Sequence, residues 1–335
     1  MKKKCNIKGK IYRKIYEIII LKLKPGKKIR NLYPSYWHRN KKRNKPMTVQ
    51  TVYYTQIPNE GAGIGHQIAN YNCGLYYSGI FRAKFVYPGF RDKEWENFLG
   101  FGEGEVSIKE LKNQGYKTRT LPFFFDNPED MALIQKIVDS YRGEKVILLA
   151  DHTQFYYRQY DVIPYIKEKF ESANARTNEM LIYDKKAINI AVHIRRGDIN
   201  SGQTTGNKEL TKRWLDLDYY KNILEQIKNV LKSDVCIYLF SQGKEDEFRV
   251  FEQYGKVVYC LDMDEKKSFL HMVRADVLIM SKSSFSYKPA LLSDGIRICP
   301  PDFWHGYPED ERWIKVGEDG RISQTDIEKI KSSEL

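Results

Sequence analysis

Short apolar runs alternate with amphipathic segments through the second half of the chain. Five runs are typical of buried strands: 187–194 (AINIAVHI), 235–240 (VCIYLF), 256–260 (KVVYC), 276–280 (DVLIM) and 296–300 (IRICP). The segments between them have helical spacing: 216–231, 244–253, 265–274 and 283–292. Strands that alternate with helices in this way predict an open, doubly wound parallel sheet.

The first half shows the same alternation less regularly. Predicted strands lie at 48–54, 83–88 and 145–150, and predicted helices at 66–80 and 129–141. The periodicity is lost around 172–186, which we take as a boundary. The pattern therefore predicts two α/β domains with a cleft between them, at 47–180 and 181–315, flanked by a basic arm at 1–46 and a tail or helix at 316–335.

The net charge of +13 is concentrated at the N-terminus. Residues 1–46 hold 17 Lys and Arg against one acid, Glu17, whereas the remaining residues hold 39 against 42 acids. The body of the chain is therefore not a basic nucleic-acid surface, and we expect no nucleic-acid partner. The apolar run IIIL of the arm is far shorter than the roughly 20 residues that span a bilayer. The arm is either a solvated basic segment or a peripheral anchor on an anionic membrane surface.

The five cysteines are scattered and form no CxxC pair. An odd number without close pairing indicates reduced thiols rather than a disulfide framework or a zinc site. The apolar content of 41% supports a packed core. We therefore expect a cytoplasmic protein. If the basic arm is an anchor, it holds the protein at the inner face of the membrane.

Charged residues follow the strand predicted at 187–194. After His193 come two adjacent arginines, Arg195 and Arg196, then a glycine and Asp198. Ligands of open α/β sheets bind beyond the carboxyl ends of the strands, and two guanidinium groups there suit a phosphate or diphosphate. The structural alternative is an internal ion pair with Asp198 or with acids elsewhere.

Serines and glycines form two further candidate contacts. Ser283, Ser284 and Ser286 crowd the start of the helix predicted at 283–292, where backbone N–H groups and hydroxyls can hold an anion. Ordinary N-capping by Ser283 or Ser284 is the alternative. The turn GAGIGHQ at 61–67 allows a close approach of backbone to ligand, but it matches neither GxGxxG nor a Walker loop.

No metal site is expected. The sequence contains no HExxH and no GxSxG segment. Acids stand at the front of predicted helices, where they favour the helix dipole: Asp216, Asp218, Asp262 and Asp264.

The segment HIRRGD resembles the HxRRxD motif of the fucosyltransferase superfamily that joins α1,2-, α1,6- and protein O-fucosyltransferases. Other segments resemble elements of the bacterial α1,2 enzymes in the same order: GAGIGHQ, LLADHTQFYYRQYDVI, DLDYYKNIL, IYLFSQGKEDEF and LIMSKSSFSYKPALL. The resemblance covers about residues 59–304. His66, Gln242 and Lys288 are among the positions that depart from the family pattern.

This resemblance implies a GT-B-like α/β architecture, with two Rossmann-like doubly wound domains facing a cleft. It implies metal-independent, inverting transfer of fucose from GDP-fucose to a glycan hydroxyl, without a cofactor and with α1,2 as the suggested linkage. Arg196 matches the family's second arginine and would be the main electrophile on the diphosphate, with Asp198 orienting the arginines. The other implied donor-binding residues are His193, Arg195, Ser283, Ser284, Phe285, Ser286, Gly63, Gly65, His66 and Gln67.

Inversion also requires a base for the acceptor hydroxyl. His66, Asp151 and His152 are the candidates, since they stand at predicted strand ends of the first domain. The expected acceptor is an oligosaccharide or lipid-linked glycan in surface polysaccharide synthesis. Two alternatives stay open: a transferase that uses another nucleotide sugar, and a non-catalytic nucleotide- or glycan-binding protein.

Overall fold

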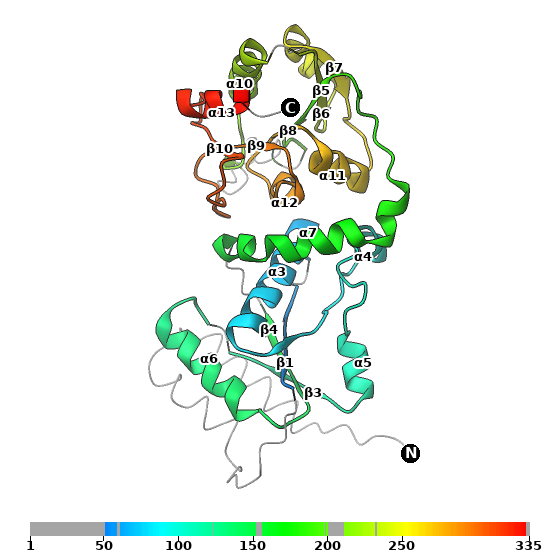
Figure 1. Ribbon diagram of the computed structural model, residues 1–335, viewed down its shortest axis with the longest axis vertical. Helices are drawn as coiled ribbons and strands as arrows, with labels where there is room; N and C mark the ends of the chain where they lie inside the picture. The colour runs from blue at the N-terminus through cyan, green and yellow to red at the C-terminus, as the bar shows by residue number, and fades with distance from the viewer. Residues whose placement is uncertain are drawn as a thin grey trace. The chain divides into compact units, whose positions relative to one another are not determined.

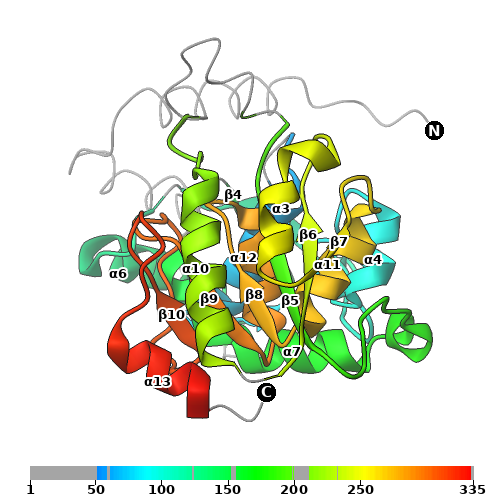
Figure 2. The same cartoon turned by 90° about the horizontal axis from the view of Figure 1, so that it is seen from above.

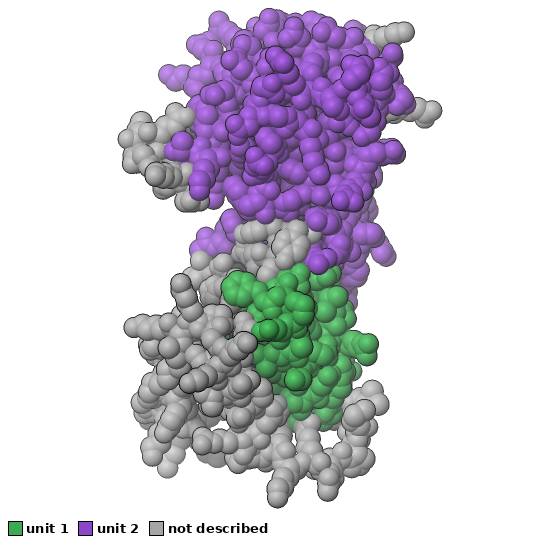
Figure 3. Space-filling model, turned by 90° about the vertical axis from the view of Figure 1, so that its left-hand side faces the viewer, with its two compact units in different colours: residues 1–58, 73–88, 106–153 green, residues 59–72, 89–105, 154–335 purple. Residues whose placement is uncertain are grey.

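The computed structural model describes residues 51–58, 61–122, 124–151, 156–197, 199, 211–231 and 233–332. The chain divides into two compact units, coloured in Figure 3. Unit 1 comprises residues 1–58, 73–88 and 106–153, and unit 2 comprises residues 59–72, 89–105 and 154–335. The basic arm lies outside the described residues, and the domain boundaries expected at 46, 180 and 315 stay predictions.

Unit 2 is built on a six-stranded sheet of β5 (Ile188–His193), β6 (Val235–Phe240), β7 (Lys256–Tyr259), β8 (Val277–Ile279), β9 (Ile296–Cys299) and β10 (Trp313–Lys315). The spatial order is β7-β6-β5-β8-β9-β10, and every neighbouring pair is parallel. This is the order of doubly wound nucleotide-binding sheets, in which ligands bind where the order reverses. The reversal lies between β5 and β8 (Figure 1).

Alternate residues of these strands enter two layers. Ile190, Ile237 and Ile279 face a core cluster that includes α10 (Leu217–Val230) and α13 (Gln324–Ser332). The other face carries α11 (Glu265–Arg274) and α12 (Ser284–Leu292), where the ring of Phe240 meets His271 and that of His193 meets Phe285. Figure 2 shows these helices around the sheet from above. Because both faces are covered, the strands are almost wholly apolar, as their sequence predicted.

The strands and helices predicted for this half are confirmed, with two differences. Residues 244–253 form two short 3₁₀ helices, η3 (Glu245–Glu247) and η4 (Arg249–Gln253), instead of one helix. Phe248 and Phe251 are three residues apart and both buried, a spacing that suits 3₁₀ geometry. Strand β10 was not predicted, because three residues are too few to show an alternation.

Unit 1 contains a second parallel sheet, in the order β2-β1-β4-β3. Its strands are β1 (Tyr53–Ile57), β2 (Lys84–Phe85), β3 (Lys117–Thr120) and β4 (Val146–Asp151). The prediction of a strand at 48–54 was wrong in its bounds, since Thr55 and Gln56 are polar yet fully buried in β1. Strand β3, KTRT, has no apolar residue and gave no signal. Both sheets are parallel and confirm the α/β class.

Helices complete both units. In unit 1, α5 (Ile108–Asn113) begins at a Ser107 capping box, and α6 (Pro128–Ser140) begins at the N-cap Asn127. Helix α3 (Ile64–Ile80) begins in unit 2 and ends in unit 1. Unit 2 also holds α4 (Lys93–Leu99), η1 (Tyr156–Val162), α7 (Ile163–Ser172) and η2 (Asn174–Asn178).

None of the helices in the described part of the chain is long and apolar enough to span a bilayer.

Candidate functional site

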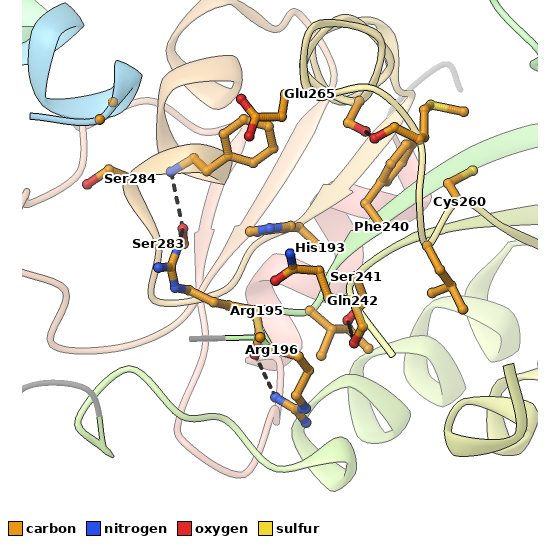
Figure 4. Close-up of a pocket in the computed structure, with 18 of the residues that line it drawn as sticks. His193, Arg195, Arg196, Phe240, Ser241, Gln242, Cys260, Glu265, Ser283 and Ser284 are labelled. Atoms are coloured by element: carbon orange, nitrogen blue, oxygen red, sulfur yellow. Dashed lines mark hydrogen bonds between the residues drawn. The ribbon is translucent and has the colours of Figure 1, made fainter. Parts of the chain in front are cut away.

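The carboxyl ends of β5 and β8 border a pocket of about 730 Å³ that is formed by residues of unit 2 (Figure 4). Small-molecule sites typically have volumes of roughly 300–1,000 Å³. The lining includes predicted donor-binding residues from all three motifs: Gly63, Gly65, His66, His193, Arg195, Arg196, Ser283, Ser284 and Phe285. The fold therefore brings together the glycine, arginine and serine segments that are far apart in the sequence.

At the end of β5, the side chains of His193 and Arg195 form hydrogen bonds with serines of the turn after β8. His193 is buried, and its Nδ1 lies 2.8 Å from Ser281 Oγ. Burial, followed by the charge of Arg195, lowers the pKa of His193 to about 3, so the ring is neutral at pH 7. The Nη1 atom of Arg195 donates to Ser283 Oγ at 3.2 Å. Arg195 thus places its guanidinium beside the start of α12.

Arg196 points away from Arg195 and Ser283 in Figure 4. Its Nη1 donates to Arg195 O at 2.9 Å and its Nη2 to Leu215 O at 3.2 Å. The guanidinium carbon lies 3.8 Å from the ring centre of Trp214. These contacts use two of the five N–H groups of Arg196 and brace the turn after β5 against residues 214–215. The role of main electrophile stays a prediction.

The serine turn both caps helix α12 and lines the pocket, the two roles considered from the sequence. Ser283 caps α12, because its Oγ accepts from the backbone N–H of Phe285 at 3.2 Å. Ser283 and Ser284 also line the pocket together with the positive end of the helix. Ser286 is fully buried and its Oγ donates to Ser283 O at 3.3 Å, so it supports the turn from behind.

The start of α3 reaches the same pocket. A Cβ atom on Gly65 would lie 2.7 Å from Ser284 Cβ, so a glycine is required for this approach. His66 also lines the pocket, and burial, followed by the charges of Lys288 and Arg213, lowers its pKa. Gln67 does not line it: its Nε2 donates to Ala62 O and its Oε1 accepts from Arg91 N. Two helix N-termini and several guanidinium groups therefore converge on one site suited to an anion.

The substitution Gly65→Ala tests this close approach. The added Cβ has to displace Ser284, so we expect the affinity for GDP, the nucleotide that the family resemblance implies, to fall about tenfold and the unfolding free energy to fall by about 1–2 kcal/mol. Calorimetric titration and urea unfolding measure both. Gly79→Ala, in the same helix but outside the pocket lining, is the matched control: nothing lies within 4 Å of its added Cβ, so GDP affinity should stay at the wild-type value and the unfolding free energy should not fall. If both variants bind GDP equally and have the same unfolding free energy, the close contact between Gly65 and Ser284 is not needed.

Among the lining residues that were not assigned to the site from sequence are Arg213, Gln242, Asp262 and Glu265. Within the described part of the chain, the guanidinium of Arg213 makes no hydrogen bond or ion pair, and its carbon lies 5.1 Å from the Trp304 ring centre. The sequence carried one indication that Arg213 has a functional role: a cation shortly before helix α10 is unfavourable beside the positive end of the helix dipole. Gln242 packs on Gly197, whose φ of +72° is left-handed.

Of the four acids at the front of predicted helices, three have structural contacts and the fourth, Asp262, lines the pocket. Asp216 accepts from Trp214 Nε1 at 2.8 Å, and Asp218 pairs with Lys221 at 2.7 Å. Asp264 caps α11. Among the described residues, no group of three or more His, Cys, Asp or Glu could hold a metal ion. Independence from a metal stays a prediction.

Besides Gln67 and Ser286, three further predicted residues are not placed in the pocket. Asp151 is the last residue of β4, in unit 1. His152 and Asp198 lie outside the described residues. Their roles as candidate base and as orienting carboxylate stay predictions.

Comparison with known proteins gives distant structural likeness. No protein-family model and no curated protein sequence matches the chain. It is similar to the crystal structure of POFUT1 in complex with GDP-fucose, with a TM-score of 0.47 and 15% identity over 79% of this chain and 97% of that one. The fucosyltransferase NodZ from Bradyrhizobium gives a TM-score of 0.39 and 10% identity over 73% and 94%. TM-scores below 0.5 do not carry a function across, so the proposal below rests on the pocket's own residues.

Proposed function

We propose that this protein is a glycosyltransferase that moves fucose from GDP-fucose to a glycan hydroxyl, with inversion and without a metal ion. The supporting observation is the pocket at the β5–β8 reversal, where two helix N-termini and the guanidinium groups of Arg195 and Arg213 converge. A nucleoside diphosphate gains negative charge as it leaves the sugar. Fixed donors of this kind stabilise that charge in the transition state.

In this proposal the diphosphate lies against Arg195, Ser283, Ser284 and the start of α12, with Arg213 as a further cation. Arg196 is retained as the predicted electrophile. The acceptor oxygen attacks the anomeric carbon from the face opposite the nucleotide, the bond from that carbon to the phosphate oxygen breaks, and the acceptor proton passes to a base. His66 suits that base because its lowered pKa keeps the ring neutral at pH 7. Asp151 and His152 are the alternatives.

The acids of the pocket support guanine as the base of the nucleotide. Asp262 and Glu265 both line the pocket. An ionised carboxylate is only an acceptor, and guanine offers it two adjacent donors, N1–H and the N2 amino group, whereas uracil offers one N–H between two carbonyls. The donor is therefore proposed to be a GDP-sugar, with another nucleotide sugar as the alternative.

The acceptor is proposed to be an oligosaccharide or lipid-linked glycan used in surface polysaccharide synthesis. The basic arm, residues 1–46, would hold the enzyme on the anionic inner face of the membrane, where such acceptors are assembled. The GT-B-like arrangement of two Rossmann-like domains around a cleft belongs to the same proposal.

A thermal-shift panel with GDP, UDP and ADP, followed by an assay of GDP release from GDP-fucose, tests the function. We expect GDP and GDP-fucose to stabilise the protein by about 2.7 kcal/mol at a hundredfold excess over Kd, and UDP and ADP to have little effect. Release of GDP should increase when a glycan acceptor is added. Protection by UDP but not GDP would overturn the donor. Binding of GDP without turnover on any acceptor pool would favour the non-catalytic binding protein.

A further inference from the structure

Four polar side chains of unit 2 form a continuous chain that ends at Ser284 in the pocket wall. Lys288, Gln159 and His305 are each at most 1% exposed. Lys288 Nζ donates to Gln159 Oε1, and Gln159 Nε2 lies 3.5 Å from His305 Nδ1. His305 Nε2 lies 2.7 Å from Ser284 Oγ. The chain therefore connects the buried amino group of Lys288 to the hydroxyl of Ser284, a residue that lines the pocket.

The direction of these hydrogen bonds follows from the groups at the buried end. A lysine ammonium only donates, so the atom of Gln159 that faces Lys288 must be the carbonyl oxygen. The amide NH₂ of Gln159 then faces His305, and it only donates as well. His305 Nδ1 must therefore be the acceptor and carry no proton.

The imidazole of His305 is neutral. Burial is the main cause that places the pKa of His305 well below its usual range, and the charges of Lys288, His66 and Arg213 add to it. The ring also stacks on Tyr287, with ring centres 4.5 Å apart at 10°. A neutral imidazole holds one N–H, and with Nδ1 occupied as an acceptor that proton is on Nε2. His305 thus donates to Ser284 Oγ.

We propose that Lys288, Gln159 and His305 are positioning residues that fix the hydroxyl of Ser284 as a hydrogen-bond donor directed into the pocket. Because Ser284 Oγ accepts from His305, its own O–H is left for the ligand, and its partner is an anionic oxygen such as that of a diphosphate. The identity of that ligand rests on the proposed function. The relay also excludes the opposite arrangement, in which His305 would take the proton of Ser284 and make it a nucleophile or base.

The tautomer of His305 tests the relay without any ligand. In ¹⁵N-resolved NMR spectra of the full-length protein at pH 7, we expect His305 to show a protonated Nε2 and an unprotonated Nδ1, assigned by the loss of both signals in His305→Gln. A protonated Nδ1 with a bare Nε2 would overturn the proposal. If GDP fails to bind, the proposed function falls, whereas the tautomer still decides the direction of the relay.

A double-mutant cycle with GDP as the probe tests the consequence in the pocket. Ser284→Ala should weaken GDP about tenfold. In Gln159→Glu, a carboxylate accepts from both Lys288 and His305 Nδ1–H, so the tautomer reverses, Ser284 must donate to His305, and GDP should again weaken about tenfold. The double variant should bind no more weakly than either single one. Further weakening by Gln159→Glu in the Ser284→Ala background would show that it acts by charge or misfolding, and would overturn the relay.

Discussion

Arg213→Ala is expected to weaken GDP binding by roughly 10–100-fold while leaving the unfolding free energy within about 0.5 kcal/mol of wild type. The side chain lines the pocket, and within the described residues its guanidinium has no hydrogen-bond or ion-pair partner that the substitution would orphan. A hydrogen bond from a guanidinium to phosphate contributes about 1.5–3 kcal/mol, which corresponds to that loss of affinity. In the proposed reaction, where negative charge grows on the leaving phosphate, turnover should fall more, by roughly 10²–10³-fold.

Calorimetric titration with GDP and urea unfolding separate the two parts of this prediction. Arg249→Ala is a matched control, since Arg249 is largely exposed and, within the described residues, its ion pair is with Asp246 on the surface. Its GDP affinity and stability should match the wild type, because exposed ion pairs contribute at most about 1 kcal/mol. Wild-type GDP affinity in Arg213→Ala would remove Arg213 from the proposed site.

The same measurements on the adjacent arginines distinguish their roles. Arg195→Ala removes the guanidinium beside Ser283 and should weaken GDP binding as Arg213→Ala does, but it also removes the hydrogen bond to Ser283 Oγ, so the unfolding free energy should fall by about 1 kcal/mol. Arg196→Ala also removes two hydrogen bonds to backbone carbonyls and a contact with Trp214, so we expect a further loss of about 2 kcal/mol in unfolding free energy. If Arg196→Ala loses turnover at wild-type stability, Arg196 acts on the reacting phosphate as the sequence predicts.

The sequence predicted the second sheet well because its strands are buried on both faces. Such strands are continuous apolar runs, and β5, β6 and β9 stand out between polar segments. The first sheet was predicted less well for the opposite reasons. Thr55 and Gln56 interrupt the apolar pattern of β1, and β3 consists only of polar residues held by pairing with β4. Strand pairing, unlike burial, leaves no trace in the hydrophobic pattern of one strand.

The sequence correctly predicted those pocket residues that lie together in short motifs of charged or hydroxyl side chains. The arginine and serine motifs each follow a recognisable strand, and parallel topology then places both at one edge of the sheet. His305 and Gln159 could not be found in this way, since each is an isolated polar residue and their contact spans 146 positions of the chain. Arg213 was missed because its only signal is an unfavourable position before a helix.

Gly100→Ala should lower the unfolding free energy by about 3 kcal/mol, the largest effect on stability that we predict for a single methyl group. Gly100 ends α4 with a φ of +67°, a conformation that costs a non-glycine residue about 1 kcal/mol. Its new Cβ would also lie 2.1 Å from Ala173 Cβ and 3.1 Å from Ala173 Cα. The overpacking adds about 1–3 kcal/mol, because main-chain atoms have to move.

This contact holds the segment 89–105 against the end of α7. Beside it, Arg176 Nη2 donates to Phe98 O at 2.8 Å and Lys169 Nζ donates to Glu103 O at 2.7 Å, so a shift at Ala173 disturbs both bonds. Gly104→Ala is the matched control four residues away: its φ is +72°, but the nearest atom to its added Cβ is Lys169 Nζ at 4.0 Å. It therefore incurs only the conformational penalty, about 1 kcal/mol. Urea unfolding measures the loss of unfolding free energy in both variants, and the difference between them is the steric contribution of Ala173. Equal losses would mean that Ala173 moves aside without cost and that this packing does not hold the segment 89–105 in place.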